Sequence, residues 1–427
     1  MTMDNNIHID ASGGEAEGEG FATRVINSRF RKDDAHGALA MPIYRNAAFE
    51  YADSETIASA FQYRPELFTY TRISNPTIEH LERKILAASG AESVIALSTG
   101  MAAISNTFFT LASAGANIIS SPHLFGNTYS FFVNTIAEFG VEVRFVNTDN
   151  IDEIRAAADD RTVAFFCELI TNPHLEVADL HAIAPIMHEM GIPMVVDTTL
   201  IPWCAFDARS AGVDIEVVST TKYVSGGATG LGGAIIDYGT FDGLRNAKLA
   251  RLPKPKGMSR FMFKIRAEIA RNLGASMAPD TAYQQSLGID MLRLRFEAAS
   301  ASALAIARHL DKHPKVVSAN YPLLEGSPYR EVTSRLIKGN PGAMLTLNLS
   351  SQEECYRFMD ALLVFHRATN LFDNRSLVIH PSSTIYGTFS PAMKKEMGVD
   401  DCLVRLSVGL EDVADLIADL DQALARL

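Results

Sequence analysis

The first two thirds of this 427-residue chain alternate between stretches of helical character and short apolar runs, with a glycine at each transition. A glycine in this place is typical of a helix that ends in a left-handed residue and turns into a strand. The apolar runs are nearly continuous and rich in valine and isoleucine, as in strands covered on both faces. The glycines are Gly90, Gly115, Gly140, Gly191 and Gly212, and the predicted strands are Ser93–Leu97, Asn117–Ser120, Val141–Val146, Thr162–Cys167, Pro193–Val196 and Asp214–Val218. This alternation predicts an α/β fold with a mostly parallel sheet, which binds ligands beyond the carboxyl ends of its strands.

A chain of this length is expected to form more than one domain. The acidic, glycine-rich residues 1–20 predict a disordered tail, and the weakly periodic residues 21–66 predict an extended arm. The α/β domain would then span residues 67–285, and a smaller α+β domain would span 286–427. The elements predicted in the smaller domain are a long helix from Ser286 to about His313, strands at Gly342–Leu349 and Leu403–Val408, and helices at Gln352–Leu363 and Glu411–Leu427.

Composition argues against several classes of protein. The formal net charge of −12 makes nucleic acid a poor partner, because a phosphate backbone repels such a surface. The four cysteines form no CxxC pair, so neither structural zinc nor a disulfide framework is expected, and a reducing cytoplasm suits the chain. The N-terminal residues lack the pattern of a signal peptide, and no run of eighteen apolar residues predicts a membrane span.

Lys222 follows the predicted strand Asp214–Val218, in surroundings that suit an anionic ligand. Ser219 and Thr221 supply hydroxyls that could bind phosphate, and the glycine-rich residues 225–233 would let a bulky ligand approach the backbone. The glycine spacing is not that of a dinucleotide fingerprint. A lysine alone at a strand end is usually solvent-exposed. A desolvated lysine near other cations instead has a lowered pKa, and its free amine can form a Schiff base.

Asp197 ends the strand that precedes the one before Lys222, one strand–helix unit earlier in the chain. Two interpretations of this aspartate stand about even. It could cap a following helix. It could also face a pyridine nitrogen, where its negative charge would favour the protonated ring and so improve the ring as an electron sink.

Two further segments could bind phosphate. The turn Ser98–Met101 follows a strand and opens a helix at Gly100, and free N–H groups at a helix start hold phosphate. Asn75-Pro76 predicts the start of another helix, just after Arg72. A guanidinium is well shaped for phosphate, although Arg72 could equally be a surface ion-pair partner.

Together these segments resemble the Cys/Met-metabolism family of pyridoxal 5'-phosphate (PLP) enzymes, over residues 21–427. The segments that carry the resemblance are Tyr70–Thr77, Ser98–Met101, Asn172-Pro173, Asp197, Ser219–Tyr223 and Val404–Asp412. The resemblance implies the aspartate-aminotransferase type of PLP fold (fold type I). It also implies PLP as the cofactor and a homodimer or homotetramer whose active sites are shared between subunits. No metal is implied.

The resemblance also implies a role for each matching residue. Lys222 would carry PLP as a Schiff base and move protons, Asp197 would pair with the ring nitrogen, and Asn172 would bind the 3-hydroxyl oxygen and the substrate. Arg405 would grip the substrate's α-carboxylate with Ser376 beside it; its apolar flanks argue against a merely exposed strand residue. The remaining roles are phosphate binding by Gly100, Met101, Ser219 and Thr221, phosphate binding in a neighbouring subunit by Tyr70 and Arg72, and stacking on the cofactor by Phe125.

The chain departs from the family pattern in places that bear on the reaction. Phe125 replaces the usual stacking tyrosine, so a phenol that could transfer protons is lost and Lys222 would carry more of that task. Asn127 replaces the cysteine of methionine γ-lyases, and Gly227-Ala228 replaces a frequent His-Gly pair.

The insertion at residues 242–271 and the segments Leu273–Pro279 and Leu371–Pro381 resemble the branch that acts on O-acetylhomoserine. The expected reaction is therefore γ-replacement on O-acetyl-L-homoserine by a sulfur nucleophile, giving homocysteine. Two alternatives belong to the same class: a γ-lyase, and a cystathionine γ-synthase acting on another homoserine ester. A non-catalytic α/β binding protein, which would be colourless, is an alternative from another class. The sulfur donor stays open among sulfide, a thiol and a carrier-bound sulfur.

Overall fold

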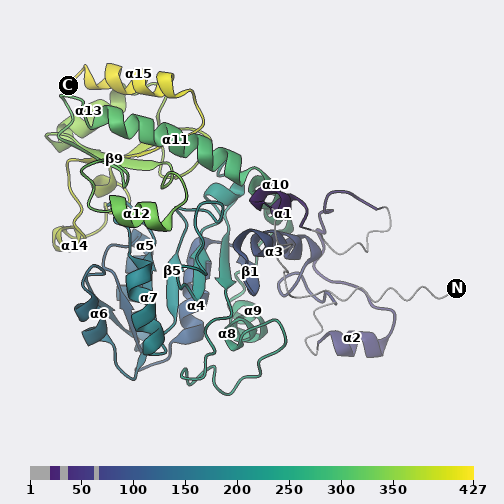
Figure 1. Ribbon diagram of the computed structural model, residues 1–427. Coiled ribbons are helices and arrows are strands. Elements are labelled where there is room, and N and C mark those ends of the chain that lie inside the picture. The colour runs from purple at the N-terminus through teal and green to yellow at the C-terminus, as the bar shows by residue number, and fades with distance from the viewer. Residues whose placement is uncertain (1–19, 29–36, 62–66) are drawn as a thin grey trace.

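The computed structural model describes residues 20–28, 37–61 and 67–427 (Figure 1). Of the predicted disordered tail at residues 1–20, residues 1–19 lie outside the described residues. Two sheets form the framework, one of seven strands in the order β1-β7-β6-β5-β4-β2-β3 and one of five in the order β10-β11-β12-β9-β8. The strands are β1 Ser93–Leu97, β2 Asn117–Ser120, β3 Glu142–Phe145, β4 Thr162–Glu168, β5 Met194–Asp197, β6 Ile215–Val218, β7 Gly233–Asp237, β8 Ser318–Asn320, β9 Met344–Asn348, β10 His366–Arg367, β11 Leu377–Ile379 and β12 Leu403–Ser407.

The predicted strands of the large sheet are all confirmed, and β3, β2, β4, β5 and β6 run parallel as expected. The prediction missed β7, which lies antiparallel to both β1 and β6. Alternate residues of each strand join different apolar clusters: Phe165 and Val196 face one side of the sheet, and Phe166 and Val195 face the other. Both faces are therefore buried, which explains the continuous apolar runs.

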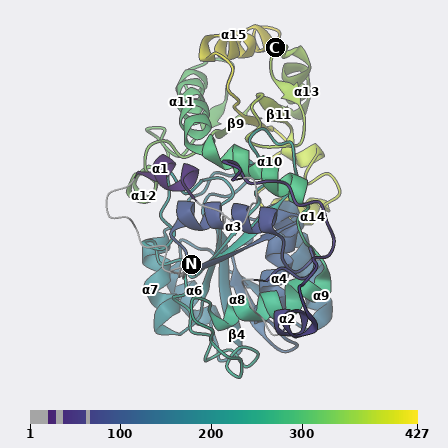
Figure 2. The same ribbon diagram turned by 90° about the vertical axis from the view of Figure 1, so that its right-hand side faces the viewer.

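Helices cover the sheets (Figures 1 and 2). In both views α11, α13 and α15 lie with the small sheet, at the opposite end of the molecule from α8. None of the described helices combines the length and apolar character that a membrane span requires. The α-helices are α1 Phe21–Ile26, α2 Ser54–Ala60, α3 Pro76–Ser89, α4 Gly100–Leu111, α5 Gly126–Ser130, α6 Ile151–Ala157, α7 Leu180–Glu189, α8 Arg260–Lys264, α9 Ala270–Leu273, α10 Pro279–Asp290, α11 Leu292–Leu310, α12 Arg330–Leu336, α13 Gln352–Ala361, α14 Pro391–Glu396 and α15 Val413–Leu424.

Local sequence signals explain several of these boundaries. The side chain of Asn75 accepts a hydrogen bond from the N–H of Thr77 at 2.9 Å, and Pro76 opens α3, as predicted. All the glycines predicted to be left-handed have positive φ, from 65° to 86°. One detail was wrong: turns, not a helix, connect β5 to β6 before Gly212.

The C-terminal region differs from the prediction in two respects: strands β8, β10 and β11 were not predicted, and the first helix is divided. The single helix expected from Ser286 to about His313 consists of α10 and α11, which break at Met291. The boundary expected between the two domains, after residue 285, falls inside α10. One apolar cluster runs from the large sheet through α11 into the small sheet, so the two sheets share a core. The division into domains stays a prediction.

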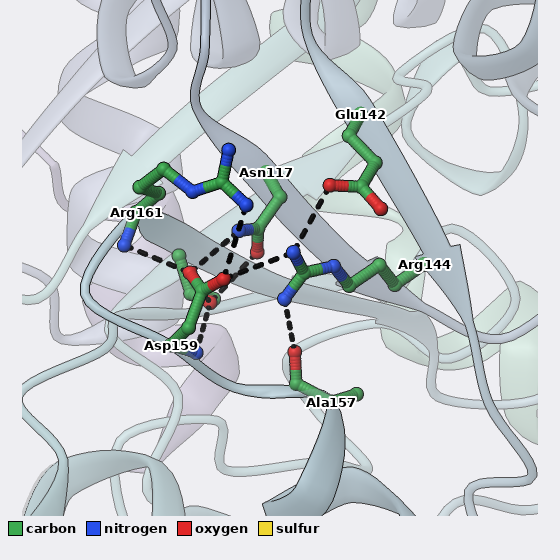
Figure 3. A network of polar contacts seen from close by, with 7 residues as sticks. Asn117, Glu142, Arg144, Ala157, Asp159 and Arg161 are labelled. Carbon is green, nitrogen blue, oxygen red and sulfur yellow. Dashed lines mark hydrogen bonds and ion pairs between the residues drawn. The ribbon is translucent and has the colours of Figure 1, made fainter.

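A polar network fixes the amino ends of β2, β3 and β4 (Figure 3). The carboxylate of Asp159 accepts hydrogen bonds from the Asn117 amide at 2.7 Å and the Arg161 N–H at 2.8 Å, and lies 2.9 Å from the Arg144 guanidinium. These contacts, the Asn117 amide foremost, hold the pKa of Asp159 below its usual range. The network lies at the sheet edge opposite the carboxyl ends, so it belongs to the framework and not to the predicted ligand site.

Candidate active site

The carboxyl ends of β4, β5 and β6 bring Glu168, Asp197 and Ser219 to one edge of the sheet. Glu168 and Asp197 are register partners on adjacent strands. The carboxylate of Asp197 accepts a hydrogen bond from the N–H of Thr199 at 2.8 Å, and the Thr199 hydroxyl accepts one from the N–H of Ser219 at 2.9 Å. Asp197 is thus tied to the segment that carries Lys222. In the described structure no helix lies between Asp197 and β6, so the capping interpretation is wrong.

The start of α4 lies against Ser219. A Cβ on Gly100 would lie 2.7 Å from the Ser219 Cβ, so only glycine allows this approach. Thr99 caps α4 through the N–H of Ala102 at 3.0 Å. Among the described residues, no acceptor reaches the N–H groups of Gly100 and Met101 or the Ser219 hydroxyl. Free N–H groups at the positive end of a helix, beside a free hydroxyl, suit a phosphate.

Thr221, the other hydroxyl predicted to hold phosphate, is already engaged. Its hydroxyl donates to the carbonyl of Gly232 at 3.2 Å and accepts from the Gly232 N–H at 3.0 Å. This pair of bonds fixes the entry into β7 beside Lys222. A phosphate contact of Thr221 therefore stays a prediction that these bonds do not favour.

The amine of Lys222 lies in a half-buried position and donates a hydrogen bond to the side-chain oxygen of Asn370 at 2.7 Å. Burial, and then the positive charge of Arg405, lower the pKa of Lys222 to about 8. A lysine with this pKa is uncharged in part of the population at neutral pH, which is the state that attacks an aldehyde.

Arg405 is a buried cation, 3% exposed. Its guanidinium donates to the side-chain oxygen of Asn172 at 3.0 Å and to the carbonyl of Asn370 at 3.2 Å, while its Nε has no partner. No carboxylate of the described residues contacts it, and burial lowers the pKa of Arg405 to about 10. A buried guanidinium with neutral partners and an unused donor is a site for an anion.

Ser376 was expected beside Arg405, but its polar atoms are committed elsewhere. Its hydroxyl donates to the carboxylate of Glu411 at 2.8 Å and accepts from the N–H of Gly409 at 2.9 Å. Asn370 contacts both Arg405 and Lys222 instead. The sequence prediction missed Asn370, which lies in a loop far from Lys222 in the chain and carries no local signal.

Glu168 is a second residue that the sequence prediction missed. Its carboxylate accepts hydrogen bonds from the N–H of Phe125 at 2.5 Å and from the N–H of Asn172 at 3.2 Å. Burial, and then the neighbouring charge of Asp197, raise the pKa of Glu168 to about 8. Burial also raises the pKa of Asp197. The sequence did contain a signal for Glu168: it is an acidic residue at the end of an apolar strand, just before Asn172-Pro173.

Tyr70 and Arg72 contact other parts of the chain. Arg72 donates to the carbonyl of Arg271 at 2.7 Å, and its guanidinium lies over the Tyr70 ring at 5.3 Å. Tyr70 is 44% exposed. No hydrogen bond links either residue to Lys222, Asp197 or Arg405 among the described contacts.

These groups fit PLP one by one. The α4 start and Ser219 suit its phosphate, Lys222 suits its aldehyde, and the half-buried carboxylate of Asp197 suits a protonated ring nitrogen. The side-chain nitrogen of Asn172 has no acceptor among the described residues and can donate to the ring oxygen. Phe125, 36% exposed at the start of α5, offers a ring face for stacking. The fold and the site together define a PLP-dependent enzyme.

Comparison with known proteins agrees with this class. The profile of the family described as "Cys/Met metabolism PLP-dependent enzyme" matches residues 22–425, and the chain belongs to this family. It is 33% identical to the O-acetyl-L-homoserine sulfhydrylase of Corynebacterium glutamicum, covering 96% of this chain and 97% of the relative. It is also 33% identical to the L-methionine gamma-lyase of Pseudomonas putida, covering 95% and 97%.

Solved structures give the same result. A putative O-acetylhomoserine (thiol)-lyase from Campylobacter jejuni, which holds a pyridoxyl-lysine phosphate, has a TM-score of 0.90 and 31% identity, covering 95% of this chain and 100% of that one. The O-acetylhomoserine sulfhydrylase of Wolinella succinogenes is 42% identical with a TM-score of 0.75, covering 82% and 96%.

Proposed function

We propose that the chain catalyses γ-replacement on O-acetyl-L-homoserine: a sulfur nucleophile replaces acetate at the γ-carbon, and homocysteine forms. The observation that carries the proposal is the buried Arg405, which lacks an anion and lies beside the Lys222 amine through shared contacts with Asn370. An α-amino acid brings both a carboxylate for Arg405 and an amino group for the cofactor. The names of the relatives from C. glutamicum and W. succinogenes support the choice of substrate.

The residues then have distinct tasks. Bound PLP supplies an electron sink for negative charge that develops on the substrate. Asp197 keeps the ring nitrogen protonated, because a carboxylate favours the neighbouring cation. Arg405 and Asn370 orient the substrate's carboxylate, which turns the α-hydrogen toward Lys222. Since Phe125 has no phenol, the Lys222 amine, with its lowered pKa, takes the α-proton and serves the β-carbon as well.

The site is proposed to be completed by a second subunit. Tyr70 pairs with Ala48 of the predicted arm. Among the described residues, neither Tyr70 nor Arg72 makes a hydrogen bond to Lys222, Asp197 or Arg405 of its own chain. An exposed guanidinium stacked on an exposed tyrosine could reach the phosphate of a neighbouring copy. A homodimer is then the smallest active unit, and a homotetramer would be a pair of such dimers.

A γ-lyase is the second candidate, because the P. putida methionine gamma-lyase shares the same 33% identity with this chain as the C. glutamicum sulfhydrylase. The two reactions differ in products. A γ-lyase forms 2-oxobutanoate and ammonia without added sulfur, whereas the proposed reaction needs a sulfur nucleophile. We expect homocysteine and acetate from O-acetyl-L-homoserine with sulfide. The proposal would be rejected if neither sulfide nor carrier-bound sulfur gave homocysteine and no thiol gave the corresponding thioether of homocysteine.

A further inference from the structure

We propose that Tyr386 is a positioning residue: its buried hydroxyl holds together the two backbone segments that present Phe125 and Asn172 to the cofactor. The inference rests on the proposed function only in that the site binds PLP. It concerns a phenol that the sequence pattern of the site did not single out.

The hydroxyl of Tyr386 reaches two backbone carbonyls at once. It lies 3.0 Å from the carbonyl oxygen of Asn172 and 3.3 Å from that of Leu124, the residue before Phe125. The side chain is 1% exposed, so water does not replace these contacts. Within the described ranges no other donor reaches either carbonyl. A single proton shared between the two oxygens therefore fixes both segments.

Asn172 is held at three atoms, and Tyr386 supplies one of these contacts. Glu168 accepts from its N–H, Arg405 donates to its side-chain oxygen, and Tyr386 donates to its carbonyl. The side-chain nitrogen remains, and it is the atom that can donate to the ring oxygen of PLP. Because the other three polar atoms of Asn172 are held, the direction of its side-chain nitrogen is set.

Close packing sets the position of the Tyr386 ring. A Cβ on Gly126, the first residue of α5, would lie 3.3 Å from the carbonyl oxygen of Ile385 and 3.6 Å from the Tyr386 ring. Phe389 contacts the ring edge-on, with centroids 5.5 Å apart. The segment 385–389 therefore packs directly against the turn that carries Phe125.

Tyr386 belongs to the part of the chain that also carries Arg405. It follows β11, which pairs with β12 through Ile379 and Arg405. His380 anchors the same segment by contacting the carbonyl of Asp401 at 2.7 Å. The Tyr386 hydroxyl thus connects the small-sheet side, which binds the substrate's carboxylate, to the large-sheet side, which binds the cofactor.

The hydroxyl acts as a donor and not as an acid–base group. Burial raises the pKa of Tyr386 far above its ordinary value, so the phenol keeps its proton at every working pH. Tyr386 does not replace the phenol that is lost at Phe125. Its hydroxyl instead holds the carbonyl of Leu124, the residue before Phe125.

The test compares the holoenzyme variants Tyr386→Phe and Tyr321→Phe. Tyr321 is a matched control: it is fully buried, and its hydroxyl donates to one backbone carbonyl, that of Gly342, at 2.8 Å. The readouts are thermal stability, the pH titration of the visible band of the bound cofactor, kcat and KM.

If the Asn172 side chain is less firmly held, its amide donates a weaker hydrogen bond to the ring oxygen of PLP. The negative charge on that oxygen is then less stabilised, and the pKa of the neighbouring cofactor proton rises. For Tyr386→Phe we therefore expect the titration midpoint to rise by about half a pH unit or more. We expect kcat/KM to fall on the order of tenfold, the loss typical of a buried hydrogen bond. Tyr321→Phe should lose stability without either change. An unchanged midpoint in Tyr386→Phe, or equal shifts in both variants, would overturn the proposal.

A second background separates positioning from general loosening. In Asn172→Ala the amide is gone, so adding Tyr386→Phe should move the titration midpoint no further. An additive shift would contradict the proposed route through Asn172. The spectral readout needs only bound PLP, so it still decides the matter if no homocysteine forms.

Discussion

Replacing Arg405 with methionine tests whether this residue serves the substrate or the fold. Arg405 is 3% exposed, and its partners within the described structure are the neutral oxygens of Asn172 and Asn370. A structural arginine would be paired with a carboxylate. We therefore expect Arg405→Met to abolish efficient turnover while leaving the ligand-free protein at least as stable.

The magnitudes follow from the burial of the charge. Burial lowers the pKa of Arg405 from 12.5 to about 10. At roughly 1.4 kcal/mol per pKa unit, holding the guanidinium charged costs the folded state about 3 kcal/mol. Losing two hydrogen bonds to neutral oxygens costs about 1 kcal/mol each, so the net change lies between zero and a gain of about 1 kcal/mol. Two lost charge-assisted bonds to the substrate's carboxylate are worth about 3 kcal/mol or more, which lowers kcat/KM at least about hundredfold.

The assays are urea unfolding of the apoprotein and steady-state homocysteine formation from O-acetyl-L-homoserine and sulfide. Arg405→Lys is the graded control, because it keeps a charge but loses the forked geometry. It should fall between wild type and Arg405→Met in kcat/KM. A loss of more than about 2 kcal/mol in the free energy of unfolding of Arg405→Met would refute the reasoning, since it would mean that a structural partner satisfies the charge.

Three further predictions concern the amine, the carboxylates and the shared site. Because the pKa of Lys222 is lowered to about 8, PLP uptake by the apoprotein should quicken about tenfold per pH unit below pH 8 and level off above it; a rate that does not vary with pH would contradict this. The pKa of Glu168 is raised from 4.5 to about 8, so its ionisation destabilises the folded apoprotein as the pH rises between those values. In paired urea titrations wild type should lose stability relative to Glu168→Gln over that range, and parallel curves would count against it. Co-expressed Arg72→Ala and Lys222→Ala subunits should regain about a quarter of wild-type activity, since half the dimers carry one intact site; an inactive mixture would argue against sharing.

The large sheet was predictable because its strands are buried on both faces and therefore carry a local signal. Strand β7 was missed although it too is buried on both faces. Residues Gly233–Asp237 follow a glycine-rich segment that suggested only a ligand loop. Their place between β1 and β6 depends on pairing with residues far away in the chain. Strand order of this kind is a property of tertiary packing, which no local pattern contains.

Some residues of the site could likewise be predicted from the sequence, and others could not. Lys222, Asp197, Gly100 and Ser219 follow strands or begin helices, so their neighbourhood could be inferred from the rule that ligands bind at the carboxyl ends of parallel strands. Asn370 could not be inferred this way, because it lies in a loop that meets Lys222 only through the packing of the small sheet on the large one. The role of Ser376 beside the substrate's carboxylate stays a prediction, and sequence order alone did not show that its hydroxyl donates to Glu411.

Lys222 is proposed to carry the cofactor as a Schiff base. Borohydride reduction of the holoprotein, followed by proteolysis and peptide mass mapping, tests it directly. We predict that a phosphopyridoxyl tag is found on the peptide containing Lys222 and on no other lysine. A tag on a different lysine, or a cofactor-loaded protein that yields no tagged peptide, would contradict the account.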